Sequence, residues 1–177
     1  MESLEILSVL AGKFGEGLEA VTEGPESHLK LPAREVASVC TFLKEDPTLD
    51  CDLLTCISAV DLKGLKGETT DDFEVVYHLE STRKLHTVCL RLRVPRESPK
   101  VPSVSAIWET ANWHEREAYD LMGIEFEGHP NLVRILCADD WVGHPLRKDY
   151  EYPKEYHGVH CEFEGNQDGT WGGHPGK

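Results

Sequence analysis

Residues 115–124 read EREAYDLMGI and complete a helical pattern that begins at Val104. Positions spaced alternately by four and three residues fall on one face of a helix. Gly123 is placed to end that helix in a left-handed conformation. We therefore predict a helix that reaches from Val104 to Gly123. Its apolar face combines five hydrophobic residues with one glutamate: Val104, Trp108, Ala111, Glu115, Ala118 and Met122.

Carboxylates lie on or beside this apolar face. Glu115 falls on the face itself, and Trp113, Glu117 and Asp120 form the adjoining stripe. A buried carboxylate is costly unless it is paired. Two interpretations are open: either the acids are buried and paired, or this part of the helix is exposed and the acids are solvated.

Pairing partners within a helix must sit three or four residues away. No base stands at those positions around Glu115, whereas His114 is within reach of Glu117. Arg116 has Asp120 four residues on. If Glu115 is buried, its partner must therefore come from outside the helix.

An arginine is the favoured partner for Glu115, because its planar fork can satisfy both carboxylate oxygens. Arg134 and Arg147 are the candidates within the chain. Such a pair would hold residues 125–150 against the helix. On that basis Glu115→Gln should cost about 3 kcal/mol or more, since it would leave the opposite charge buried and unpaired.

The composition fits one acidic domain with a tail. The chain has 177 residues, 40% of them hydrophobic, and a formal net charge of -14. Such a charge repels nucleic acid and anionic lipid, so basic protein surfaces are the expected partners. The acidic start of the chain does not read as a signal peptide, and no apolar run approaches the ~20 residues that span a bilayer.

Upstream of the helix, the pattern predicts an α+β fold in which helices pack on one face of a mostly antiparallel sheet. The 53–60 run is nearly continuously apolar, so we expect a central strand covered on both faces. Residues 95–102, with three prolines, should be an irregular connector. The other expected elements are a helix over 4–14, strands over 18–22 and 28–31, a helix from Pro32 to Asp46, and a hairpin of 73–80 with 86–94.

Three regions follow from these patterns: an α+β domain over 1–124, a motif-rich segment over 125–150 that packs on the domain and on a partner, and an extended tail over 151–177. The tail is rich in Gly, Pro and charge. It should be ordered only against other proteins, and limited proteolysis should then remove it from the free chain alone. Its aromatic residues are the expected anchors: Tyr152, Tyr156, Phe163 and Trp171.

The motifs in the sequence support neither a catalytic site nor a metal-binding site. His114-Glu115 begins like a zincin helix, but Ala118 replaces the second histidine. His157, His160 and Cys161 resemble a metal cluster, yet they stand in predicted coil, which fixes no geometry. No cysteine pair has the Cys-x-x-Cys spacing, and no glycine-rich nucleotide loop is present. We expect no metal or cofactor on this chain; the alternative is a stand-alone metal-dependent enzyme that uses the histidine-rich C-terminal third.

A run of ordered motifs carries a family resemblance. Residues 112–124 read NWHEREAYDLMGI, followed by Phe126, GHPNL at 128–132, RIL at 134–136, DDW at 139–141 and PLRKDY at 145–150. The VPR at 94–96 and VPSV at 101–104 precede them. Together these motifs closely resemble the C subunit family of NADH-quinone oxidoreductase, respiratory complex I. The dense match covers about 94–150.

The resemblance implies a structural subunit in the hydrophilic arm of a proton-translocating complex, at the cytoplasmic face of the inner membrane in bacteria. It implies docking on the large quinone-site subunit (D-like) near cluster-bearing subunits (B-like and I-like). FMN, iron–sulfur clusters and quinone would then reside in partner subunits, with none in this chain. An alternative is the equivalent subunit of a related complex with another donor, such as ferredoxin, or of a membrane hydrogenase.

Nine polar residues are the candidates for holding the fold or the interface. A basic residue of the large subunit is a further possible partner for Glu115. Arg147 and Lys148 are adjacent bases that could dock on partner acids, close onto acids of this chain, or stand in solvent. The nine are Glu115, Arg116, Glu117, Asp120, His129, Arg134, Arg147, Lys148 and Asp149.

Overall fold

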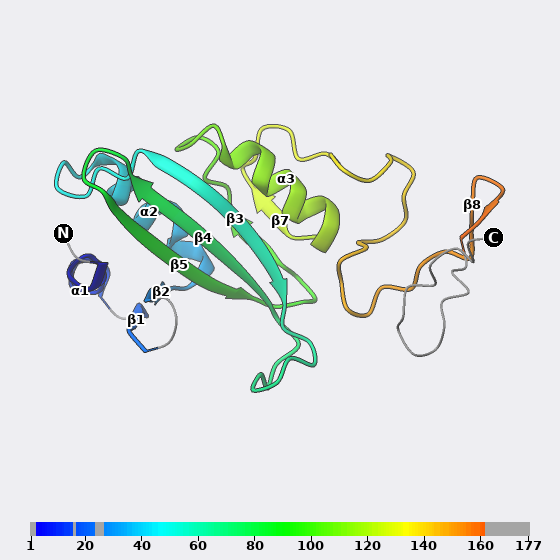
Figure 1. Ribbon diagram of the computed structural model, residues 1–177, viewed down its shortest axis with the longest axis horizontal. Coiled ribbons are helices and arrows are strands. Elements are labelled where there is room, and N and C mark those ends of the chain that lie inside the picture. The colour runs from blue at the N-terminus through cyan, green and yellow to red at the C-terminus, as the bar shows by residue number, and fades with distance from the viewer. Residues whose placement is uncertain (1–2, 16, 24–26, 162–177) are drawn as a thin grey trace, which may run out of the picture.

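A computed structural model describes residues 3–15, 17–23 and 27–161 (Figure 1). Within these ranges, three α-helices and a five-stranded sheet form the main body, and there are two further short strand pairs. The elements in chain order are α1 (Ser3–Phe14), β1 (Glu19–Val21), β2 (His28–Lys30), the 3-10 helix η1 (Ala33–Glu35), α2 (Val36–Glu45), β3 (Leu53–Asp61), β4 (Phe73–Ser81), β5 (His86–Val94), β6 (Lys100–Pro102), α3 (Ala111–Met122), β7 (Glu125–Glu127), β8 (Glu155–Tyr156) and β9 (Val159–His160).

The main sheet has the strand order β1-β2-β5-β4-β3. β4 and β5 form the predicted hairpin, with Phe73 opposite Val94 and Ser81 opposite His86. Only the β2–β5 pair of this sheet is parallel. The predicted α+β class with a mostly antiparallel sheet is therefore confirmed.

One hydrophobic core joins the sheet to the three helices. Alternate residues of β4, among them Phe73, Val75 and Tyr77, belong to this core. In Figure 1, α2 lies behind the three long strands and α3 lies beyond β3, while α1 is at the opposite end beside β1. Burial of Cys40 and Tyr77 within the core raises the pKa of both side chains.

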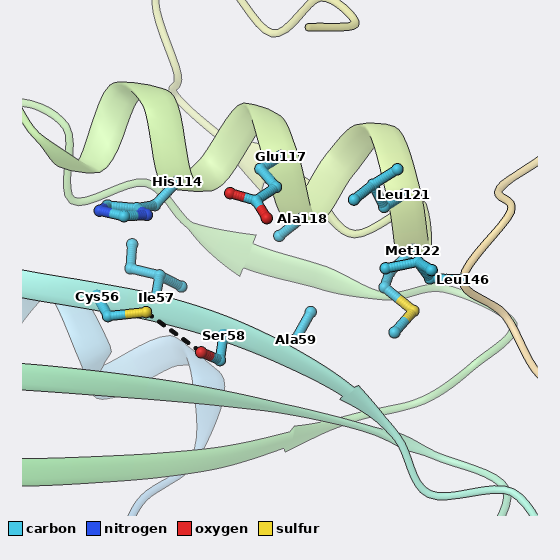
Figure 2. A pocket seen from close by; sticks show the side chains of 10 residues that line it. All are labelled: Cys56, Ile57, Ser58, Ala59, His114, Glu117, Ala118, Leu121, Met122 and Leu146. Atoms are coloured by element: carbon cyan, nitrogen blue, oxygen red, sulfur yellow. Dashed lines mark hydrogen bonds between the residues drawn. The ribbon is translucent and has the colours of Figure 1, made fainter. Parts of the chain in front are cut away.

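β3 is an edge strand, so the prediction of a central strand over 53–60 was wrong. Its apolar run has another cause. Leu54 and Ile57 are buried in the main core, and α3 lies alongside β3, as Figure 2 shows. A helix that covers the edge of a sheet removes a site at which other chains could pair. Because α3 covers β3, this edge strand can carry as many apolar residues as a central strand.

α3 begins at Ala111 and not at Val104, which corrects the predicted length of this helix. Val104 and Trp108 are buried as expected, but they lie in turns before the helix. Eleven helical residues would separate positions 104 and 115 by roughly 16 Å. The amide nitrogen of Val104 instead lies 2.7 Å from Oε1 of Glu115, because the chain folds back at this point.

Before α3, the 95–102 connector is less irregular than predicted, because its strand β6 pairs in parallel with β7, which follows α3. Beyond β7 the described part of the chain has little regular structure. β8 and β9 form a small hairpin inside the region predicted to be an extended tail. Residues 162–177, with the expected anchors Phe163 and Trp171, lie outside the described part. No helix in the described ranges is long and apolar enough to cross a membrane.

Candidate functional site

Asp120 is the polar centre of the contact between α3 and the segment that follows it. Its side chain is fully buried. Oδ1 accepts a hydrogen bond of 2.6 Å from Nη1 of Arg134. Oδ2 accepts three backbone N–H groups, from Ile135 (3.0 Å), Leu136 (2.7 Å) and Cys137 (2.8 Å). Consecutive amides that converge on one oxygen form an anion-binding nest, here occupied by a carboxylate of the same chain.

These hydrogen bonds hold the pKa of Asp120 well below its usual range, although burial opposes them. A carboxylate with such donors is stable in its charged form despite burial. The interaction predicted for Glu115, an arginine pair that holds the following segment, is therefore made by Asp120.

The last four carbonyl groups of α3 are also bound. A helix leaves these groups without partners inside the helix. Gly123 N–H donates to Tyr119 O (2.8 Å), and His144 Nδ1 donates to Asp120 O (2.9 Å). The same segment supplies the last two donors, since Leu146 N–H binds Leu121 O (3.1 Å) and Arg147 Nε binds Met122 O (2.7 Å).

Arg147 fits closely against the end of α3. Its guanidinium carbon lies 5.1 Å from the ring centroid of Phe73, and that of Arg96 lies 4.6 Å from the same ring. Gly123 has the predicted left-handed conformation, with φ 73°. A Cβ atom at Gly123 would overlap Nη2 of Arg147 and would lie 2.5 Å from Nε2 of His144. Only glycine therefore fits both the backbone angle and the approach of these two side chains.

A second polar junction joins the 145–150 segment to the ends of β3 and β5. Asp61 is buried and pairs with Arg96, and its Oδ2 accepts the backbone N–H of Lys148 at 2.9 Å. Arg96 also pairs with Asp149 at 3.1 Å. Lys63 contacts Asp149 at 3.3 Å. The side chains of Arg147 and Lys148 bind backbone carbonyl groups of this chain, Met122 O and Lys63 O, and within the described ranges they do not close onto its acids as considered for them. In the same ranges, only the backbone N–H of Lys148 reaches an acid, Asp61.

Glu115 is fully buried, as its place on the apolar face predicted, but within the described residues it has no arginine partner. Arg134 pairs with Asp120, and Arg147 binds a helix carbonyl, so both in-chain candidates were wrong. Glu115 instead accepts hydrogen bonds from Ser103 Oγ (2.6 Å) and Val104 N–H (2.7 Å). It therefore fixes the turn that leads into α3.

Burial raises the pKa of Glu115 from 4.5 to about 7, and the bonds from Ser103 and Val104 oppose the rise. A folded-state pKa above the unfolded value means that the native state binds the extra proton. Stability from this group is full below pH 4.5 and is lost as pH rises towards about 7.

Near pH 4.5, Glu115→Gln is expected to change the free energy of unfolding by less than about 1 kcal/mol, because a neutral amide replaces a protonated, neutral carboxyl group. At pH 7–8 the variant should be more stable than the native chain by about 3 kcal/mol, because it lacks the loss that deprotonation of Glu115 causes between pH 4.5 and 7. Urea unfolding of both chains across this pH range is the measurement. A loss of 3 kcal/mol or more at neutral pH would instead indicate a buried cationic partner.

Arg116 on α3 and His129 beyond β7 are two further candidates with separate contacts. Arg116 donates to the carbonyls of Val133 and Arg134 (3.1 Å each), whereas Asp120, four residues on, pairs with Arg134. His129 Nδ1 accepts Asn131 N–H at 3.0 Å, so its Nε2 carries the proton that binds Asn112 O. His129 therefore joins the GHP turn to the start of α3.

Glu117 is exposed and lines a cavity of about 240 Å³ between α3 and β3 (Figure 2). His114 lies on the same wall, and Cys56 and Ser58 face it from β3, with 3.3 Å between Sγ and Oγ. These groups do not form a triad in which a base activates a nucleophile. In the described ranges, no group of three His, Cys, Asp or Glu side chains could hold a metal ion, and this includes the cluster at 157–161.

The sequence model of a known family matches residues 29–156, and its description is the 30 kDa subunit of respiratory-chain NADH dehydrogenase. That match spans most of the chain, including every contact of Asp120 given above. The chain belongs to this family.

Two relatives extend the match. The C subunit of NADH-quinone oxidoreductase from Chlorobium phaeobacteroides is 38% identical over 92% of this chain and 96% of its own length. The corresponding subunit from Chloroherpeton thalassium is 41% identical over 88% of this chain. This chain spans 63% of that longer relative. The family resemblance inferred from the sequence motifs is confirmed.

Solved structures share the fold. The trypsin-resistant fragment of Nqo5 aligns with a TM-score of 0.64 and 29% identity, covering 75% of this chain and all of the fragment. A chain of an archaeal membrane-bound sulfane sulfur reductase, described as a respiratory membrane complex, aligns with a TM-score of 0.69. It is 24% identical and covers 95% of this chain and 98% of its own, so it shows the fold alone.

The sequence patterns did not predict Asp61 and Arg96 of the second polar junction, nor Phe73, whose ring Arg96 and Arg147 contact. A usable signal was present in the hairpin register. Asp61 pairs with Phe73, which pairs with Val94, so residues just after β5 must lie near the end of β3. An acid at the end of β3, Asp61, and a base just beyond β5, Arg96, are then expected to meet.

Proposed function

We propose that this chain is a structural subunit, without a catalytic site of its own, in the hydrophilic arm of a proton-translocating NADH:quinone oxidoreductase. It docks on the large quinone-site subunit, at the cytoplasmic face of the membrane, through residues 125–161. Cluster-bearing subunits lie close by. Family membership supports the complex, and the segment itself supports the docking role.

The observation that carries this proposal is the orientation of side chains along residues 125–161. Its polar groups bind inward, through Asp120, Asp61 and the end of α3. Several of its large apolar side chains face outward, whereas Phe126 is buried in the core and Leu132 packs against it. Of the large hydrophobic side chains exposed in the described ranges, six lie here: Val133, Leu136, Val142, Leu146, Tyr152 and Val159.

Single exposed hydrophobic residues are ordinary, but their concentration on one segment indicates a protein interface. The side chains of Arg134, Arg147 and Lys148 in this segment are already bound within the chain, so much of its affinity for a partner is expected to come from apolar burial. That chemistry suits a permanent neighbour in a complex. We propose that FMN, iron–sulfur clusters and quinone reside in such neighbours, and metal and flavin analysis of the isolated chain tests this assignment.

Val142→Asp is expected to reduce incorporation of the subunit into the complex by tenfold or more, since it places a charge where apolar burial is required (about 1.4 kcal/mol per factor of ten). Val142 is 84% exposed, so the free chain should keep its stability. Affinity purification of the tagged chain from membranes, with quantification of co-purified subunits, measures incorporation.

Leu85→Asp is the matched control, because Leu85 is equally exposed (85%) but lies in the β4–β5 turn. It should incorporate normally. The NADH:quinone reductase rate per assembled complex should be unchanged in both variants. Normal incorporation of Val142→Asp would reject the docking role, and full incorporation with slow turnover would reject a purely structural one. A flavin-binding, NADH-oxidising subunit among the co-purified chains identifies the donor, whereas a ferredoxin-type subunit supports the related complex.

A further inference from the structure

A cavity of about 340 Å³ opens between the 140–143 turn and the 150–156 stretch. Its walls are aromatic. The rings of Trp141 and Tyr156 are tilted against each other with centroids 5.0 Å apart, and Tyr150 forms a third wall. Tyr152 packs edge-on against Tyr150, also at 5.0 Å, and supports that wall from outside.

Several contacts fix this cavity in shape. Tyr150 Oη donates to Val142 O at 3.0 Å. A Cβ atom at Gly143 would lie 2.7 Å from the Tyr150 ring, so only glycine permits this close approach. Tyr156 Oη donates to Asp140 Oδ1 at 2.7 Å, which joins the two sides of the opening.

The rim of the cavity is acidic. Asp140, Glu151 and Glu155 line it and are exposed, and none of the described residues that line it is a lysine or an arginine. His157 is the base beside this rim, with Nε2 2.8 Å from Asp140 Oδ2. Lys154 is next to the rim in sequence but does not line the cavity. An aromatic cavity with such a rim attracts a cation and repels an anion.

We propose that this cavity receives the guanidinium group of an arginine side chain on a partner subunit. A guanidinium plane stacks on aromatic rings and its fork binds carboxylates, and both features are present here. Lysine has neither the planar face nor the paired donors. The inference rests on the proposed docking function and adds a polar anchor beside the apolar side chains of the segment.

The test measures how much subunit remains on the purified complex as the NaCl concentration rises. Glu151→Gln with Glu155→Gln should weaken retention about tenfold at low salt and flatten its salt dependence, since screening acts on the lost pairs. Glu45→Gln with Glu97→Gln removes two exposed charges elsewhere and should change nothing. Trp141→Leu should weaken retention at every salt concentration without changing the slope.

Competition identifies the cation. Guanidinium chloride at low millimolar concentration should release more subunit than ammonium chloride of equal ionic strength, and only when Glu151 and Glu155 are intact. Equal release of the subunit by both salts would contradict the proposal that the bound side chain is an arginine. Unchanged retention of the double glutamine variant would reject the cavity as an anchor while leaving the docking function standing. Absence of the native chain from the complex would reject both.

Discussion

Asp120→Asn is expected to lower the free energy of unfolding by about 3–5 kcal/mol, because it leaves the guanidinium of Arg134 without its carboxylate in a buried setting. The side-chain oxygen of the introduced asparagine could accept from either Arg134 or the backbone N–H groups of residues 135–137. Its NH₂ group would then point at the other set, which also consists of donors. Asp139→Asn, an exposed neighbour, is the control and should change stability by less than about 0.5 kcal/mol.

Urea unfolding at pH 7 measures this difference, and acid titration adds a second readout. The folded-state pKa of Asp120 is lowered, so its stabilisation is present above its unfolded value of 3.8 and is lost as pH falls below it. Native chain and variant should therefore converge in stability at low pH. A variant as stable as the native chain at pH 7 would contradict the role assigned to Asp120.

Gly123→Ala is expected to destabilise the chain by about 3 kcal/mol or more, from two additive causes. A left-handed backbone costs a non-glycine residue roughly 1–2 kcal/mol. The new methyl group must also displace Arg147 and His144 from the end of α3, which breaks their hydrogen bonds to the helix carbonyls.

Gly64→Ala separates these two causes. Gly64 has φ 66°, close to that of Gly123, and a Cβ atom there would meet nothing within 4 Å. It should therefore show only the backbone cost. Thermal and urea unfolding of both variants give the difference, and equal losses would show that the contacts of Arg147 and His144 contribute nothing.

Local patterns predicted the helices and the five strands of the main sheet, but not the short strands β6 to β9. The spacing from Val104 to Met122 identified buried residues correctly, and Gly123 marked the end of α3. The β4–β5 hairpin followed from residue type and a turn. Such features depend on neighbours in sequence, which is why local spacing and residue type were enough to predict them.

Long-range partners could not be predicted in this way. Periodicity placed Glu115 inside, but it could not show that Ser103 and Val104 fold back to meet it. It also could not choose between Glu115 and Asp120 as the partner of Arg134. An apolar strand covered by α3 looks like a central strand, so the position of β3 was wrong for the same reason.

Hydrogen exchange of the 132–161 backbone amides, compared between the free chain and the assembled complex, tests the docking account most directly. Amides held by Asp120, at residues 135–137, should already be protected in the free chain. Around Val142 and Tyr152, which present exposed apolar side chains, exchange should slow at least tenfold on assembly (about 1.4 kcal/mol). Exchange in this segment that is the same in both states would contradict the claim that it docks the subunit.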